Sequence, residues 1–287
     1  MYYGLIVLSV IMFGGCFALN DVYRKMRGSS LKISLQFSLV SSLAGLVVLL
    51  AVNGFKLEFT PFTLLIAFLS SLVSLGFTFC AFKALGIINL SLYSLFSMLG
   101  GMLLPFVQGI VFYGEKMTLA KIVCFVFIFV ALLLTVEKSE KTKGTIYYIG
   151  IFVLNGMSGV LSKIFASSEF EKTSAAGYSI LIALCSAVLS GIIILLFFMK
   201  KDETSKMKLS DTGVGALNGI TNKIANFLLV IALANVDASV QYPMVTGGVM
   251  IVSTLICFFG KNKPSKKELL SVVLAFVGML ALFVIPV

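Results

Sequence analysis

The side chains best suited to chemistry in this sequence lie in an apolar segment near residues 211–234. Asn218, Asn222 and Asn226 are spaced four residues apart, so in a helix each lags the one before by about 40° and all three share one face. Lys223 lies about 60° past Asn226, at the edge of that face. An ammonium group beside three amides offers donors and acceptors that suit a polar, anionic molecule.

Lys223 is a costly residue for an apolar segment. A lysine at the centre of a membrane-spanning helix costs about 2.5–3.5 kcal/mol on insertion, and such residues usually serve a function. The alternative is that the asparagines hydrogen-bond between helices while Lys223 extends its ammonium group to the membrane interface. Because Lys223 lies near the centre of its segment, that extension is difficult. We therefore favour a position in the lining of a cavity.

Other apolar segments carry polar side chains that could line the same cavity. Hydroxyls recur every four residues in 61–84, an amide adjoins Gly156, and Gln-Tyr-Pro opens the segment 238–258. The proline frees a backbone carbonyl and can break the helix beside a cavity. For the hydroxyls, the alternative is close helix packing. The predicted substrate-binding residues are Lys223, Asn222, Asn226, Asn218, Asn155, Tyr93, Gln241, Tyr242, Ser74 and Thr78.

Histidine and carboxylate side chains, on which acid–base catalysis and most catalytic metal sites depend, are missing from the apolar segments. The 287-residue chain contains no histidine, and its twelve Asp and Glu residues fall in expected loops or at helix ends. The five cysteines all fall within apolar segments, which excludes a secreted disulfide framework. Membrane enzymes acting on lipid-linked substrates use clustered carboxylates or histidines, usually with a metal. We expect no enzyme activity, metal or cofactor, and a polytopic membrane enzyme is the less favoured alternative.

Ten apolar stretches of roughly twenty residues must position these side chains. Hydrophobic residues make up 59% of the chain and charged residues only 12%, about half the charged fraction of a soluble domain. In lipid a helix satisfies its own backbone hydrogen bonds, whereas spanning strands would be shorter and alternating. We expect an all-α integral membrane protein with transmembrane helices at 2–22, 31–53, 61–84, 90–113, 119–136, 145–166, 174–199, 211–234, 238–258 and 267–285.

The distribution of basic residues predicts an orientation in the membrane. The formal net charge is +10, but the lysines and arginines lie in short loops, which favours a topological role over binding of nucleic acid. Sixteen of them fall on the side of the loops that follow the odd-numbered spans, and five fall on the opposite side. The positive-inside rule therefore places both termini outside the cell.

The two halves of the chain repeat the same landmarks. The first half contains Ala84–Ser91, Gly100-Gly101 and Phe112–Thr118, and the second contains Ala232–Ser239, Gly247-Gly248 and Phe258–Ser265. Matching landmarks are 148, 147 and 146 residues apart. Because five is odd, a tandem copy of five helices enters the membrane in the opposite orientation, as in many transporters. We expect two inverted five-helix repeats, residues 1–140 and 141–287, in one membrane domain.

Short motifs occur in a characteristic order in the first half. Ala-x-x-Ala-Leu at 81–85 precedes a fourth segment with Ser and Gly, then Gly-Glu-x-x-Thr at 114–118 and a short fifth segment. In this order the chain resembles, over essentially its whole length, the drug/metabolite transporter superfamily in its ten-helix EamA-type form. The resemblance implies alternating access to a central cavity lined by helices 1, 3, 4, 6, 8 and 9. Lys261 stands where the family usually has Glu, and family members usually keep both termini in the cytoplasm.

These observations together predict a secondary transporter of a small polar metabolite in the cell (inner) membrane. A lone central cation among amides suits a carboxylate-bearing or zwitterionic solute such as an amino acid. Amides also suit a nucleobase- or vitamin-like ring, which stays open as an alternative. The expected partners are the small-molecule solute and the lipid bilayer, without nucleic acid, and the expected assembly is a monomer or a homodimer.

The predicted orientation can be tested with a fused reporter that is active only in the cytoplasm. Attached to the C-terminus, it should be silent, because the loop charges place that terminus outside. The same reporter inserted within residues 137–143, an expected cytoplasmic loop, is the positive control. An active C-terminal reporter would show instead that the chain follows the usual topology of the family it resembles.

Overall fold

The structure is a computed structural model that describes residues 1–28, 30–85, 90–134, 145–198, 207–259 and 266–285. All the regular secondary structure within these ranges is helical. The helices are α1 (Tyr2–Arg27), α2 (Leu31–Val52), α3 (Pro61–Leu85), α4 (Leu90–Tyr113), α5 (Leu119–Leu134), α6 (Thr145–Ser167), α7 (Ala175–Phe197), α8 (Leu209–Leu233), α9 (Ala238–Phe259) and α10 (Lys266–Val284).

The helices predicted from the sequence are confirmed, and their ends agree within two residues everywhere except at the end of α1. That helix continues to Arg27, five residues past the predicted end. Its last turn carries Arg24, Lys25 and Arg27, and cations there interact favourably with the helix dipole. Pro243 does not break α9, which runs through it without interruption. Apolar composition therefore located the helices well, but it did not locate a polar helix end.

Among the described residues, eight helices are long and apolar enough to cross a membrane: α1, α2, α3, α4, α6, α7, α8 and α9. The described apolar parts of α5 and α10, residues 119–131 and 269–284, are shorter. Large apolar side chains such as Val111, Leu196 and Phe283 point outward and are more than half exposed. An apolar exterior of this kind is expected of helices that face lipid rather than water.

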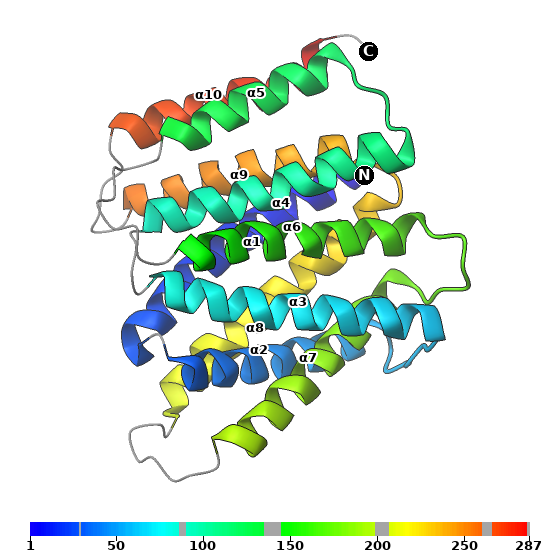
Figure 1. Cartoon of the computed structure of the whole chain (residues 1–287), viewed down its shortest axis with the longest axis vertical. Coiled ribbons are helices and arrows are strands. Elements are labelled where there is room, and N and C mark those ends of the chain that lie inside the picture. The colour runs from blue at the N-terminus through cyan, green and yellow to red at the C-terminus, as the bar shows by residue number, and fades with distance from the viewer. Residues whose placement is uncertain (29, 86–89, 135–144, 199–206, 260–265, 286–287) are drawn as a thin grey trace.

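Within the described chain, all ten helices lie side by side, and the start of α1 and the end of α10 lie on the same side of the molecule (Figure 1). α5 and α10 pair along one edge, whereas α2 and α7 lie towards the opposite edge. α1 packs on α8 and α9, and α6 packs on α3 and α4. α2 packs on α8, as α7 packs on α3. The neighbours of α1 are thus numbered five apart from those of α6, and the same holds for α2 and α7.

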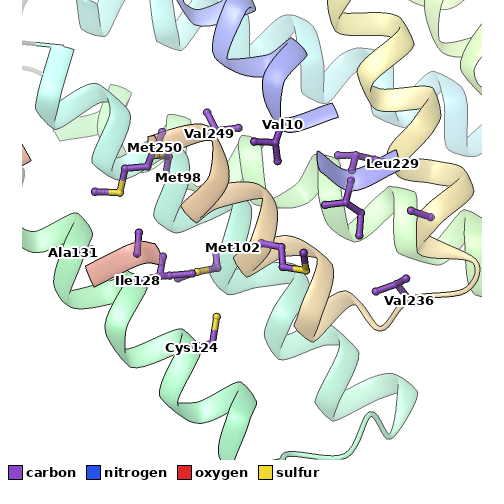
Figure 2. Packing of buried hydrophobic residues seen from close by; sticks show 14 of the residues in the cluster. Val10, Met98, Met102, Cys124, Ile128, Ala131, Leu229, Val236, Val249 and Met250 are labelled. Carbon is purple, nitrogen blue, oxygen red and sulfur yellow. The ribbon is translucent and has the colours of Figure 1, made fainter. Parts of the chain in front are cut away.

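The largest buried apolar cluster joins helices from both halves (Figure 2). Val10 of α1 and Met98 and Met102 of α4 belong to it, together with Ile128 of α5 and Val249 of α9. Lipid is as apolar as these side chains, so their contribution comes from close van der Waals packing rather than from removal of water. The cluster fixes α1, α4 and α9 around one side of the interior.

Two helix crossings bring backbones into direct contact through glycine. At the crossing of α2 and α8, a Cβ added to Gly219 would overlap the backbone carbonyl of Ser41. At the crossing of α4 and α6, a Cβ added to Gly100 would overlap the carbonyl of Phe152. Small residues permit this approach, which strengthens helix packing in membranes. Each crossing holds a helix of the first half directly against a helix of the second.

Gly219→Ala should destabilise the protein, because the added methyl group must displace the backbone of α2. Overpacking of this kind costs about 1–3 kcal/mol. Gly213→Ala in the same helix is the matched control, since nothing lies within 4 Å of its added Cβ. That change should be neutral or should stabilise the helix by up to about 1 kcal/mol. Thermal unfolding of both variants in detergent measures the difference, and equal midpoints would contradict the described crossing.

Candidate binding cavity

A cavity of about 300 Å³ lies between the two halves of the chain and is lined by α1, α2, α3, α4, α6, α8 and α9. Nine of the ten predicted residues line it: Lys223, Asn222, Asn226, Asn218, Asn155, Gln241, Tyr242, Ser74 and Thr78. The tenth, Tyr93, belongs to α4, but its side chain lies outside the described residues. α2 was not an expected lining helix, and it contributes Ser38, Ser41 and Ser42.

Lys223 is the group that distinguishes this cavity. Its stem lies over Gly45 of α2, where a Cβ would overlap it. No Asp, Glu, Arg or second Lys is found among the described residues that line the cavity. Nor does an ion pair or hydrogen bond join Lys223 to any partner in the described ranges. The ammonium group thus brings a positive charge into the interior that the described side chains do not compensate.

Several predicted residues bond one helix to another in this structure. Each donates a side-chain hydrogen bond to a backbone carbonyl of a different helix, as the interhelical alternative proposed. The bonds run from Asn218 Nδ2 to Cys16 O (3.1 Å), Asn155 Nδ2 to Ser97 O (2.6 Å), Gln241 Nε2 to Leu229 O (3.1 Å) and Tyr242 Oη to Gly159 O (2.9 Å). These four residues hold the walls of the cavity together as well as lining it.

Asn222 and Asn226 bond to each other along α8. The Nδ2 of Asn226 donates to Asn222 Oδ1 at 3.0 Å and to the Asn222 carbonyl at 2.9 Å. Asn226 is exposed although it lines the cavity, so its amide is open to the interior space. The pair presents a fixed polar edge immediately beside Lys223.

The hydroxyl groups in the wall divide into bonded and available donors. Thr78 donates to the Ser74 carbonyl at 2.9 Å, and Ser162 donates to the Ser158 carbonyl at 3.0 Å. The hydroxyls of Ser74 and Ser158 themselves have no partner among the described groups, and neither is sealed from the cavity. Ser158 was not among the predicted binding residues. Its position three residues after Asn155, on the same face of α6, was the signal for it.

A second, smaller cavity of about 70 Å³ adjoins the first between α3, α6, α7 and α8. Ser74, Ser158 and Lys223 line both cavities and so lie where the two meet. Ser70 and Tyr178 also line the smaller cavity, and their hydroxyls are 3.0 Å apart. We refer to this space as the side chamber. Its described lining is largely hydroxyl groups, with Lys223 as the cation.

Comparisons with known proteins establish the fold and no more. No family model matches the sequence, and no curated protein matches it. Twenty-nine chains of solved structures match the fold. One crystal structure, described only as that of a protein, has a TM-score of 0.75 at 17% sequence identity. The match covers 96% of this chain and 94% of the other chain, so the whole helical arrangement occurs in a solved protein.

Nothing in the described chain suggests a metal centre, since no group of three or more His, Cys, Asp or Glu side chains gathers there. The described cysteines are not joined in disulfides. The described lining of the cavity therefore offers hydrogen-bonding groups and one positive charge.

Glu115 fixes the end of the molecule where α9 begins. Its carboxylate accepts hydrogen bonds from the backbone N–H groups of Ala238 and Ser239, both at 2.9 Å, and from the Ser239 hydroxyl. Lys163 of α6 forms an ion pair with it at 2.8 Å, and both side chains are buried. The carboxylate thus caps α9, where the helix dipole favours a negative charge. Sequence reasoning noted Glu115 only as part of a family motif.

The pKa of Glu115 is the net result of opposing effects. Burial raises it, but the hydrogen bonds from Lys163, from Ser239 and from the backbone of Ala238 hold it below the ordinary value of 4.5. A carboxyl whose pKa falls on folding stabilises the protein fully above its unfolded pKa, and that stabilisation is lost as pH falls through the folded value. The Glu115 cluster should therefore weaken only below about pH 4.5.

Glu115→Gln should lower the thermal midpoint near neutral pH, since it leaves Lys163 buried without a countercharge. Breaking such a pair costs about 3–5 kcal/mol. The gap between wild type and variant should narrow as pH falls below about 4.5, because the wild-type carboxylate becomes protonated. Glu171→Gln, at an exposed loop residue, is the control and should have little effect. A difference in thermal midpoint between wild type and Glu115→Gln that stays constant down to acidic pH would contradict an ionised Glu115 paired with Lys163.

Proposed function

We propose that this chain is a ten-span secondary transporter related to the drug/metabolite transporter superfamily. The matching landmarks of the two halves support an inverted repeat of residues 1–140 and 141–287. The helix neighbours support it independently, since α1 meets α8 and α9 as α6 meets α3 and α4. In such proteins the substrate site lies near the middle of the membrane, at the interface between repeats. The cavity around Lys223 is lined by helices of both halves, which supports this proposal.

Alternating access requires the cavity to open to each side in turn. We assign the closed end of this conformation to the Glu115–Lys163–Ser239 cluster. These contacts join Glu115, in the loop after α4 of the first half, to Lys163 of α6 and Ser239 of α9 in the second half. Rocking one half against the other would break them and open that end. The protein would lie in the inner membrane with both termini outside, as its loop charges predict.

The ammonium group of Lys223, which has no countercharge among the described residues, is the observation that carries the proposal. A cation in the interior of a membrane protein without a countercharge is unfavourable, and an anionic solute supplies the missing charge when it binds. The solute is therefore a carboxylate-bearing or zwitterionic metabolite such as an amino acid. The Asn222–Asn226 pair favours one other class, a nucleobase- or vitamin-like ring, because such rings match the donors and acceptors of amides.

Uptake into proteoliposomes distinguishes these classes. The purified protein would be tested with labelled protein amino acids in one set and with labelled uracil and adenine in another. Saturable uptake of an amino acid supports the proposal, and uptake of a nucleobase alone would favour the ring alternative. Lack of uptake or exchange of either set, in correctly folded protein, would contradict transport of both classes.

Lys223→Ala should leave the protein folded and at least as stable as wild type, while affinity for the transported solute falls about tenfold or more. Lys223→Arg should restore binding only in part, since a planar guanidinium differs in shape from a compact ammonium. Lys83→Ala, which removes a lysine outside the cavity lining, is the matched control and should bind normally. Poor yield of Lys223→Ala with normal affinity in the surviving protein would instead indicate a structural lysine.

A further inference from the structure

We propose that the place where the side chamber meets the main cavity is a carboxylate subsite formed by Lys223, Ser74 and Ser158. The inference rests on the proposed function in that the carboxylate belongs to the transported solute. It adds where the anionic group binds and which hydroxyls select it. The rest of the solute then occupies the main cavity of about 300 Å³.

Hydrogen-bond donors without an acceptor identify this place. Among the described hydroxyls of the side chamber, those of Ser74 and Ser158 have no acceptor, whereas Ser162 and Ser179 donate to carbonyls of their own helices. Lys223 likewise has no acceptor among the described groups. α3, α6 and α8 thus each contribute at least one available donor to the same junction. Donors that converge without an acceptor suit an oxyanion.

The size and charge of the junction favour a carboxylate over a phosphate. The side chamber is about 70 Å³, enough for a carboxylate group or a few water molecules. Ser70 and Tyr178, whose hydroxyls are 3.0 Å apart, also line it. One lysine balances one negative charge, whereas phosphate recognition typically uses arginines or several cations. No arginine lines either cavity in the part of the chain that the structure describes.

Charge-selective labelling tests the subsite without requiring the transported solute itself. Ser74→Cys and Ser158→Cys would each be reacted with anionic sulfonatoethyl methanethiosulfonate and with its cationic trimethylammonioethyl analogue. The readout is the ratio of the two rates, which removes differences in thiol reactivity. Thr78→Cys, one turn from Ser74 and in contact with the main cavity alone, is the matched control. Labelling of wild type gives the background from the native cysteines.

The anionic reagent should be favoured at both serine positions by about tenfold more than at Thr78, because Lys223 attracts the sulfonate. Adding Lys223→Gln should abolish that excess. A mixture of protein amino acids should slow labelling at Ser158→Cys, whereas the corresponding amino acid amides should not. The two substituted helices, α3 and α6, provide independent tests should one variant fold poorly.

The two kinds of failure can be told apart. Equal ratios at Ser74, Ser158 and Thr78, or protection by the amides, would overturn the subsite even where transport of an amino acid depends on Lys223. Charge preference with protection by the acids, but without transport in proteoliposomes, would support the subsite and overturn the proposed function.

Discussion

An ammonium group near the middle of α8 imposes the most demanding constraint on this structure. It must be kept from lipid, yet the described residues give it no carboxylate partner. Gly45 provides room for the stem of Lys223, and Gly219 allows α2 to approach α8 at the same crossing. The amides and hydroxyls of the surrounding helices then give the charge a polar environment. The cavity follows from these requirements, since a fully packed apolar interior would leave the cation unsolvated.

Two kinds of contact support the cavity, close packing between helices and polar contacts between the halves. Glycine crossings between backbones are close, and a cluster of apolar side chains joins α1, α4, α5 and α9. By contrast, Glu115 reaches across from the loop after α4 to cap α9 and to pair with Lys163. Such polar contacts between halves can exchange for water or for other partners with little change in packing. This combination suits a protein whose halves move as units around a fixed site.

The helices and most of the cavity could be predicted from the sequence because apolar length and four-residue spacing are local properties. Asn218, Asn222 and Asn226 share a face of α8 as their spacing required, and the polar residues of α3, α6 and α9 line the same space. What could not be predicted depends on contacts between distant segments. The docking of Glu115 on Ser239, the approach of Gly45 to Lys223 and the availability of the Ser158 hydroxyl are all of this kind.

The central claim is that the charge of Lys223 recognises the charge of the solute. Calorimetric titration can test it with protein amino acids and their amides, in wild type and in Lys223→Gln. The account predicts that wild type binds an acid at least about tenfold more tightly than its amide and that this ratio approaches one in the variant. An acid-to-amide ratio that is the same in both proteins would show that Lys223 does not recognise the carboxylate.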